Sequence, residues 1–199
     1  MKELILQTKV TTCTLEEMEP SMRELVEKAK AMTQNAYCPY SHFHVGAAAR
    51  LADGQIVAGS NQENAAYPSG LCAERTTLFA ANANNPNTPV EALAIACYTQ
   101  GHYTKDAASP CGACRQVMLE TEHRFGKPMQ VILYGEDMCY VFDSAADLLP
   151  QLVHYGLADT QGSCSFNYRV GQLLGYDRDI QGFSPPVSTF PGTPSDRAA

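Results

Sequence analysis

Three cysteines and one glutamate combine side-chain types and spacings that can carry out chemistry. Cys111 and Cys114 form a Cys-x-x-Cys pair, which puts two thiolates one helical turn apart, so that both can reach one Zn²⁺. A third thiolate from Cys72 would leave the fourth tetrahedral position open for water, as a catalytic zinc site requires. Both segments are expected to begin helices, whose partly positive N-termini favour thiolates. We therefore predict that Cys72, Cys111 and Cys114 bind zinc.

Two charged residues shortly after Cys72, Glu74 and Arg75, extend the prediction. Glu74 stands two positions after Cys72, so its carboxylate can point at a water held by the metal without binding the metal itself. A carboxylate there can take a proton from that water and pass it to a ring nitrogen. Three thiolates give a zinc site a net charge near −1, and we expect the Arg75 guanidinium to offset this charge by donating hydrogen bonds to the sulfurs.

Simpler interpretations stay open for each of these residues. Cys111 and Cys114 also suit a redox dithiol, or a structural zinc site with His102 or His123 as the fourth ligand. The simpler interpretation of Glu74 and Arg75 is that they are ordinary surface residues of a helix. Cys97 lies in an apolar run and is predicted to be a small core residue. The remaining cysteines show no pairing pattern and receive no role: Cys13, Cys38, Cys139 and Cys164.

The elements that must position these side chains alternate along the chain. Helices are predicted over residues 20–35, 72–84 and 110–124, with a last helical turn over 144–149. Apolar runs predict strands over 44–51, 55–59, 90–98, 129–134 and 138–142, and Asp53-Gly54 is typical of a hairpin turn between the first two. This alternation indicates an α/β layered sheet. We predict one domain over residues 1–155, followed by a Gly/Pro/Ser-rich extension, 156–199, that is largely disordered.

Composition narrows the class of protein. The chain has 199 residues, of which 45% are hydrophobic, and 14 Lys and Arg against 21 Asp and Glu give a net charge of −7. This acidic balance argues against a protein that coats nucleic acid, but it allows a small nucleoside as a substrate. No run approaches the roughly 18 apolar residues of a membrane span, and no secretory signal is recognised, so we expect no membrane partner and a reducing, cytoplasmic location.

Four motifs in order resemble the cytidine deaminase family over roughly residues 20–150. A thiolate-bound zinc, a glutamate that is not a ligand and a Pro-Cys-x-x-Cys signature characterise base deaminases in general. The Cys-Ala-Glu-Arg motif resembles the short, homotetrameric, three-cysteine branch of the cytidine deaminases. The segments that carry the resemblance are Tyr37-Cys38-Pro39-Tyr40-Ser41-His42-Phe43, Gly59-Ser60-Asn61-Gln62-Glu63-Asn64-Ala65-Ala66-Tyr67-Pro68, Cys72-Ala73-Glu74-Arg75 and Pro110-Cys111-Gly112-Ala113-Cys114-Arg115-Gln116.

The resemblance implies a three-layer α/β/α fold with a mixed, roughly five-stranded sheet, and a role for several further residues. Asn61 and Glu63 would bind the ribose hydroxyls, Phe43 would stack on the pyrimidine, and the backbone of Ala73 and its neighbour Cys72 would read the base edge. Ala65 and Tyr67 would reach into the site of a neighbouring subunit. The implied reaction is the zinc-dependent hydrolysis of cytidine and 2′-deoxycytidine to uridine and 2′-deoxyuridine with release of ammonia, a step of pyrimidine salvage.

One departure from the family lies near the C-terminus. Relatives carry a phenylalanine three residues after a Leu-Leu-Pro segment, whereas this chain has Val153 there, with Tyr155 or Phe166 as substitutes. We therefore expect a looser pocket that tolerates N4-substituted cytidines. Three other functions compete: a deaminase of a cytosine-containing antibiotic, which Asn61 and Glu63 disfavour, a deaminase of tRNA or DNA bases, and an inactive zinc-stabilised binding module, which Glu74 disfavours.

Overall fold

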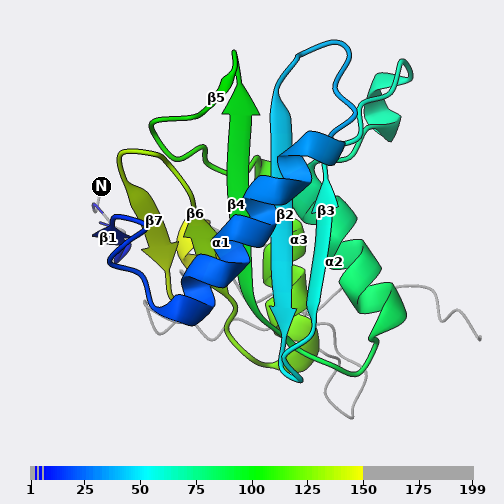
Figure 1. Ribbon diagram of the computed structural model, residues 1–199. Coiled ribbons are helices and arrows are strands. Elements are labelled where there is room, and N and C mark those ends of the chain that lie inside the picture. Colours follow the sequence, from blue (N-terminus) through cyan, green and yellow to red (C-terminus); the bar gives the residue numbers. More distant parts are fainter. Residues whose placement is uncertain (1–2, 4, 6, 150–199) are drawn as a thin grey trace, which may run out of the picture. The chain divides into compact units, whose positions relative to one another are not determined.

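A mixed β-sheet forms the centre of the computed structural model, which describes residues 3, 5 and 7–149 (Figure 1). Its strand order is β1-β7-β6-β4-β2-β3, and β5 also pairs with β4. Among the described strands, only β4 and β6 pair in parallel, and the other pairs are antiparallel. The strands are β1 (Thr11–Cys13), β2 (His44–Leu51), β3 (Ile56–Ser60), β4 (Val90–Thr99), β5 (His102–Tyr103), β6 (Gln130–Leu133) and β7 (Cys139–Phe142).

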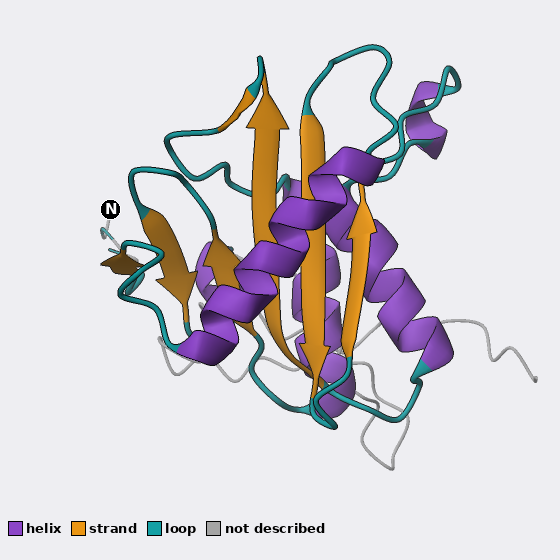
Figure 2. Cartoon of the chain, viewed as in Figure 1, coloured by secondary structure: helices purple, strands orange, loops and turns teal. Residues whose placement is uncertain are grey.

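Helices cover both faces of this sheet, as the three-layer prediction requires (Figure 2). Helix α1 (Pro20–Met32) packs on one face, whereas α2 (Ala73–Asn84) and α3 (Gly112–Phe125) pack on the other. Three short 3₁₀ helices complete the described elements: η1 (Thr33–Asn35), η2 (Tyr67–Ser69) and η3 (Ala145–Leu148). The predicted fold class is confirmed. The sheet contains the five predicted strands and two further short strands, β1 and β5.

Local sequence signals explain where the elements begin and end. Pro20 opens α1, where its missing N–H costs no helical hydrogen bond. Gly126 ends α3 in the left-handed conformation, with φ of 62°. Gly54, with φ of 86°, turns the β2–β3 hairpin. The predicted helix over 20–35 ends earlier than expected, because residues 33–35 tighten into η1.

Alternation along β2 and β4 builds two cores. Leu93 and Ile95 face α2 and α3, whereas the alanines between and beside them face α1. Small side chains on the α1 face let the helix approach closely. The approach is tightest at Gly46, where a Cβ would overlap the carbonyl oxygen of Ala29. Apolar burial on both faces therefore fixes the sheet between its helices.

The sheet topology also sets the place of the site. Strands β3 and β4 are both antiparallel to β2, so their carboxyl ends lie beside the start of β2. Helix α2 follows β3 in the chain, and α3 follows β4 and β5. The N-termini of the two helices are consequently brought to the same edge of the sheet.

Some sequence-based expectations fall on residues beyond 149. The predicted domain boundary at residues 155 and 156 and the extension 156–199 lie outside the described residues. The same holds for Val153, Tyr155 and Phe166, so the expectation about N4-substituted cytidines stays a prediction.

Candidate active site

Three cysteine thiols meet at the edge where α2 and α3 begin. Cys72 is the N-cap of α2, Cys111 is the N-cap of α3, and Cys114 lies in the first turn of α3. Their sulfur atoms all lie within 4.8 Å of one another, and the sulfurs of Cys72 and Cys111 are 3.9 Å apart. Tetrahedral Zn²⁺ with Zn–S bonds of about 2.3 Å requires sulfurs about 3.8 Å apart, so the thiols fit this metal.

The surroundings of Cys72 favour the thiolate form that a metal requires. The pKa of Cys72 is lowered to about 5, chiefly by a hydrogen bond from the Cys114 thiol and also by the Arg75 guanidinium. The pKa of Cys114 is raised because its thiol donates to Cys72 and because it is buried near Glu74. The thiols thus share protons that a divalent cation would displace.

No histidine completes this cluster among the residues that the structure describes. The only group of three or more metal-binding side chains found there is Cys72, Cys111 and Cys114. A structural zinc site would need a fourth protein ligand, and neither His102 nor His123 belongs to the group. The three thiols are not oxidised to disulfides either, since all seven cysteines of the described region are free. The geometry therefore favours three ligands and an open position.

Glu74 lies beside the thiols and is almost fully buried. Only 4% of its surface is exposed, and its Oε2 atom is buried with no hydrogen-bond partner among the described residues. Burial raises the pKa of this carboxyl group, and the negative charge of Cys72 adds to the effect. A buried carboxylate oxygen without a hydrogen-bond partner is costly to folding, which indicates that Oε2 is placed to bind a ligand group.

A cavity of about 440 Å³ opens in front of these residues. It has the size of a site for a small organic molecule. Eight of the predicted site residues line it: Phe43, Asn61, Glu63, Tyr67, Cys72, Glu74, Arg75 and Cys111. The cavity lining does not include Cys114 and Ala73, which are buried, nor Ala65, which is exposed. Most of the predicted residues are thus brought together by the fold.

Asn61 uses both ends of its carboxamide to hold the loop that carries Phe43. Its Oδ1 atom accepts a hydrogen bond from the Val45 amide at 2.8 Å, and its Nδ2 atom donates to the Phe43 carbonyl at 2.9 Å. An amide nitrogen has two hydrogens, so one remains for a ligand. The sequence indicated that Asn61 binds the ribose, but it did not predict these hydrogen bonds within the protein.

Glu63 holds the same loop from its other side. Its Oε2 atom accepts hydrogen bonds from the backbone amides of Tyr40 and Ser41 at 2.9 and 3.3 Å. Hydrogen bonds from the Ser41 side chain and the Tyr40 backbone lower the pKa of this carboxyl group, so it is an anion near neutral pH. A carboxylate accepts up to about four hydrogen bonds, which leaves capacity for hydroxyl groups in the cavity.

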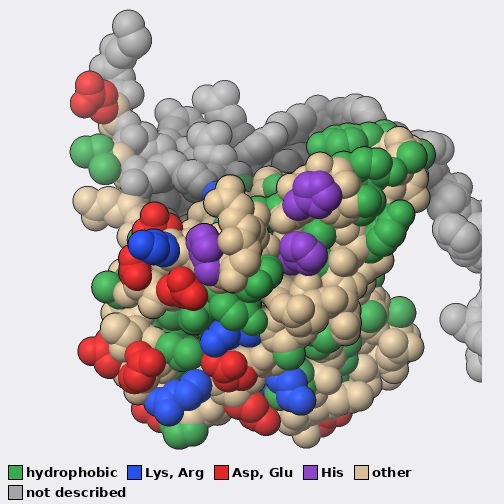
Figure 3. Space-filling model, turned by 45° about the horizontal axis from the view of Figure 1, so that its top comes forward, with side chains coloured by type: hydrophobic (Ala, Val, Ile, Leu, Met, Phe, Trp, Pro, Cys, Tyr) green, Lys and Arg blue, Asp and Glu red, His purple; other side chains and the backbone are tan. Residues whose placement is uncertain are grey.

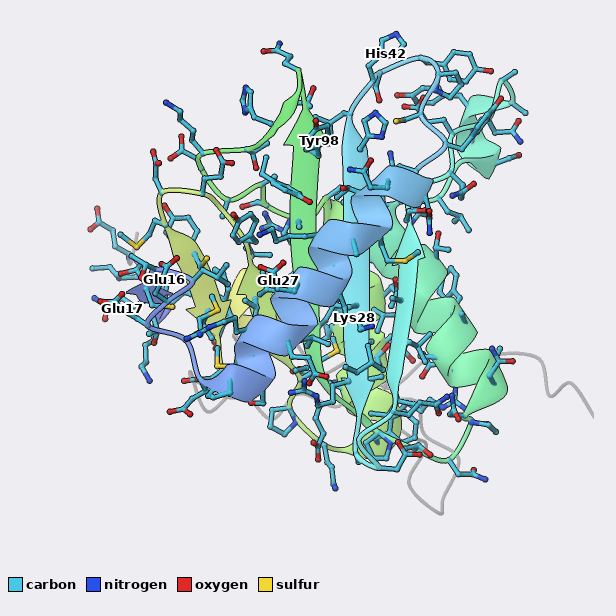
Figure 4. All side chains as sticks on the ribbon, in the orientation of Figure 1. Glu16, Glu17, Glu27, Lys28, His42 and Tyr98 are labelled. Carbon is cyan, nitrogen blue, oxygen red and sulfur yellow. The ribbon has the colours of Figure 1, made fainter. Side chains whose placement is uncertain are left out.

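A strained turn directs Phe43 toward the cavity. His42 has a φ of 54°, a left-handed conformation that is uncommon for residues other than glycine. Its carbonyl accepts a hydrogen bond from Thr99 at the end of β4, at 3.3 Å. Figure 4 places His42 and Tyr98 at this end of the sheet, where the ring of His44 meets that of Tyr98 edge-on, with centroids 6.1 Å apart. These contacts tie the loop to the sheet.

Arg75 contacts the thiol cluster directly. Its guanidinium lies 3.9 Å from the sulfur of Cys72 and 3.4 Å from the carbonyl oxygen of Gly70. Arg75 is therefore near enough to Cys72 for its positive charge to stabilise a thiolate.

Sequence reasoning missed several residues that line the cavity. Val45, Ile95 and Cys97 provide part of the apolar wall. Cys97 was predicted to be a core residue and is 97% buried, since 3% of its surface is exposed, yet it also borders the cavity. Burial raises the pKa of its thiol to about 12, with a contribution from Glu74. The period-two pattern of β4 could have identified it, because Cys97 continues the face of Leu93 and Ile95.

The molecular surface is of mixed character. On the face seen in Figure 3, Lys and Arg side chains lie among Asp and Glu side chains, with hydrophobic groups between them. Tyr67, at the cavity, exposes 89% of its surface, and Tyr40 exposes 59%. Within the described part of the chain, no helix has the length and apolar character needed to cross a bilayer.

Comparison with known proteins identifies the family. Residues 20–125, which include all three thiols and Glu74, match the model of the cytidine and deoxycytidylate deaminase zinc-binding region. Cytidine deaminase from Halalkalibacterium halodurans is 45% identical over 96 residues, which are 48% of this chain and 68% of that protein. A probable cytidine deaminase from Dictyostelium discoideum is 32% identical over 67% of this chain and 84% of its own length.

Solved structures agree with the sequence comparison. The crystal structure of cytidine deaminase from Burkholderia pseudomallei is 43% identical, has a TM-score of 0.54 and covers 65% of this chain and 96% of its own. The crystal structure of cytidine deaminase from Mycobacterium leprae is 31% identical and has a TM-score of 0.52. The match covers 67% of this chain and 100% of that chain. With the thiol cluster and its neighbouring glutamate inside the matched region, the chain belongs to the zinc-binding family of cytidine and deoxycytidylate deaminases.

Proposed function

We propose that this protein is a zinc-dependent cytidine deaminase that converts cytidine and 2′-deoxycytidine to uridine and 2′-deoxyuridine. Water replaces the amino group at C4, and ammonia is released. The observation that carries the proposal is the buried Glu74 carboxylate, whose Oε2 atom has no hydrogen-bond partner among the described residues, beside three clustered thiols at a cavity of about 440 Å³. A structural zinc site has no use for such a carboxylate.

The thiolates of Cys72, Cys111 and Cys114 hold the metal in this proposal. Their mutual distances and the lowered pKa of Cys72 support the assignment. Zn²⁺ in this position supplies Lewis acidity, which makes water nucleophilic near neutral pH. Arg75 offsets the excess negative charge of the thiolates, which would otherwise weaken that Lewis acidity.

Glu74 moves protons between the water and the base. Its carboxylate accepts a proton from the attacking water and delivers it to N3 of the pyrimidine. It then transfers the second proton to the amino group at C4, the carbon–nitrogen bond breaks, and ammonia leaves. The raised pKa of Glu74 supports this role, because a proton shuttle works best when its pKa lies near the working pH.

Other residues at the cavity and at the start of α2 bind the nucleoside. Phe43 stacks on the pyrimidine, while the backbone of Ala73 and Cys72, at the start of α2, binds the base edge. Asn61 and Glu63 bind the ribose hydroxyls with the hydrogen-bonding capacity that their internal contacts leave. Both residues also hold the Phe43 loop, so sugar binding and base stacking are supported by the same two side chains.

The protein acts as a homotetramer in this proposal, with Ala65 and Tyr67 reaching the site of a neighbouring subunit. The exposure of Tyr67 beside the cavity supports this assembly, since a large aromatic residue there is suited to contact a partner. The measurement is light scattering after size exclusion, with a mass of four times 21.6 kDa expected. A cytoplasmic location, where thiols stay reduced, completes the proposal.

A paired assay tests the reaction. The ultraviolet absorbance change of cytidine is followed with the purified protein and with Glu74→Gln, and zinc is measured in both. Glu120→Gln, an exposed residue of α3, is the matched control. We expect turnover in the parent protein and the control, and a loss of about 10²-fold or more in Glu74→Gln at equal zinc.

The outcomes separate the parts of the proposal. Full turnover by Glu74→Gln would refute the proton shuttle. A parent protein that holds zinc but does not turn over cytidine would point to a different aminated cytosine substrate, with N4-substituted cytidines tested next. A protein with neither zinc nor turnover would refute the mechanism as a whole.

A further inference from the structure

We infer that Arg115 is a positioning residue that fixes Cys111 by fastening the loop before α3 to η3. The inference rests on the proposed role of Cys111 as a zinc ligand. It makes zinc retention depend on the position of η3, whose residues 145–148 lie near the end of the described part of the chain.

Arg115 forms a fork between two carbonyl groups. Its Nε atom donates to the carbonyl of Pro110 at 2.8 Å, and its Nη1 atom donates to the carbonyl of Leu148 at 2.8 Å. Its own backbone amide donates to the carbonyl of Cys111 at 3.0 Å. The carbonyls of the residue before Cys111 and of Cys111 itself are therefore both bonded to Arg115.

Cys111 needs this support more than the other two thiols do. Cys114 is fully buried and packs in the core, and Cys72 is half-buried, whereas Cys111 is exposed. Packing against neighbours cannot fix an exposed N-cap residue, so its sulfur is positioned by backbone hydrogen bonds. Besides the Arg115 contacts, the amide of Cys114 donates to the Cys111 sulfur at 3.5 Å.

The other end of η3 is fastened to the same helix. Glu122 lies seven residues after Arg115, and therefore on the same face of α3. Its Oε1 atom accepts from the amides of Ala145 and Met129 at 2.8 and 2.6 Å, and the Ser144 hydroxyl donates to it at 3.0 Å. Helix α3 thus holds the start of η3 through Glu122 and its end through Arg115.

Arg115 and Glu122 both hold η3 but differ in one respect, so Glu122 can serve as the control for Arg115. Only Arg115 also bonds to the loop that carries Cys111, through Pro110. Glu122 contributes to the same packing of η3, but its hydrogen bonds are to Met129, Ser144 and Ala145, none of which lies in that loop. A change at Arg115 should therefore affect metal retention beyond any effect on folding, whereas a change at Glu122 should affect folding alone.

Three variants of the full chain test the inference. Arg115→Met keeps the aliphatic stem but removes the donors, Arg115→Lys keeps the charge but not the planar fork, and Glu122→Gln is the control. Zinc affinity is measured by competition with a chromogenic chelator, and the folded fraction by far-ultraviolet circular dichroism. The thiolate-to-cobalt charge-transfer absorption of the Co²⁺-substituted proteins reports the geometry of the thiol cluster.

We expect Arg115→Met to bind zinc about 10–100-fold more weakly, as for other outer-shell residues, with an altered cobalt spectrum. Arg115→Lys should lie between this variant and the parent protein. Glu122→Gln should lower the urea midpoint but bind zinc with the affinity of the parent protein, within about twofold.

Parent-like zinc affinity and cobalt spectrum in Arg115→Met would overturn the inference. So would an equal loss of affinity in Glu122→Gln at equal folded fraction, because the effect would then be general destabilisation. If Arg115→Met does not fold, Arg115→Lys decides by the same criteria. Cys111→Ser is measured alongside: zinc retention there would refute the proposed ligand set itself, which separates that failure from a failure of Arg115 alone.

Discussion

Replacing Asn61 by aspartate tests whether this residue holds the Phe43 loop as well as a sugar. The substitution preserves shape and the oxygen that accepts from the Val45 amide. It replaces the nitrogen that donates to the Phe43 carbonyl, 2.9 Å away, by a second oxygen. One hydrogen bond is thereby exchanged for a repulsive contact between two acceptors.

The expected cost follows from this geometry. Loss of the hydrogen bond costs about 1 kcal/mol, and a partly buried carbonyl without a donor costs about 1 kcal/mol more. We therefore expect the free energy of unfolding to fall by about 2 kcal/mol at about pH 8, which corresponds to a urea midpoint lower by about 1 M.

The loss should depend on pH in a definite direction. A protonated carboxyl group donates a hydrogen bond to the Phe43 carbonyl, so the pKa of the introduced group is raised in the folded state above its unfolded value of about 3.9. The protonated group then restores stability as the pH falls through the raised pKa. Relative to the parent protein at the same pH, the deficit should shrink by about half between about pH 8 and pH 5.

The assay is urea unfolding at fixed protein concentration, followed by far-ultraviolet circular dichroism because the chain contains no tryptophan. Asn64→Asp is the control: it changes the charge equally on the same loop, but keeps the Oδ1 atom that accepts from the Ala66 amide at 2.8 Å. Its unfolding midpoint should match that of the parent protein. An Asn61→Asp midpoint equal to that of the control, or a deficit that grows toward low pH, would refute the reasoning.

Three further perturbations have definite outcomes. Gly46→Ala places a Cβ over the Ala29 carbonyl and 2.8 Å from the Thr33 nitrogen, both backbone atoms of the α1–η1 segment, so we expect a loss of about 3 kcal/mol in urea unfolding; unchanged stability would contradict the packing of α1. Hydrogen bonds lower the pKa of Glu63 in the folded protein from its ordinary value of 4.5. The Glu63 anion therefore stabilises the Phe43 loop fully above pH 4.5, and this stabilisation is lost only as the pH falls through the lower folded pKa. The KM for cytidine should therefore show no Glu63-dependent change between about pH 8 and pH 5, whereas Glu63→Gln should raise KM throughout this range, as steady-state kinetics will measure. Removal of zinc with a chelator should abolish turnover and make the thiols of Cys72, Cys111 and Cys114 more reactive toward a disulfide reagent, and added zinc should reverse both changes; turnover that survives chelation would exclude the metal mechanism.

Features that depend on nearby residues could be predicted from the sequence. The Cys-x-x-Cys spacing of Cys111 and Cys114 matches one helical turn, and the starts of α2 and α3 were predicted within two residues. Asp53-Gly54 predicted the β2–β3 hairpin, and the long apolar runs predicted the five main strands. Helical periodicity, turn chemistry and apolar run length each act over a few residues, so one sequence is enough to recognise them.

Other features became evident only in the tertiary structure. The short strand β1 exists because the distant strand β7 pairs with it, and no apolar run marks it. Cys97 borders the cavity, Asn61 bonds to Phe43 and to Val45 at the start of β2, and Arg115 reaches Leu148, 33 residues along the chain. The sequence determined which side chains can bind a metal and move a proton. The tertiary structure decided which backbone groups hold them in place, because those contacts join segments that only the folded sheet brings together.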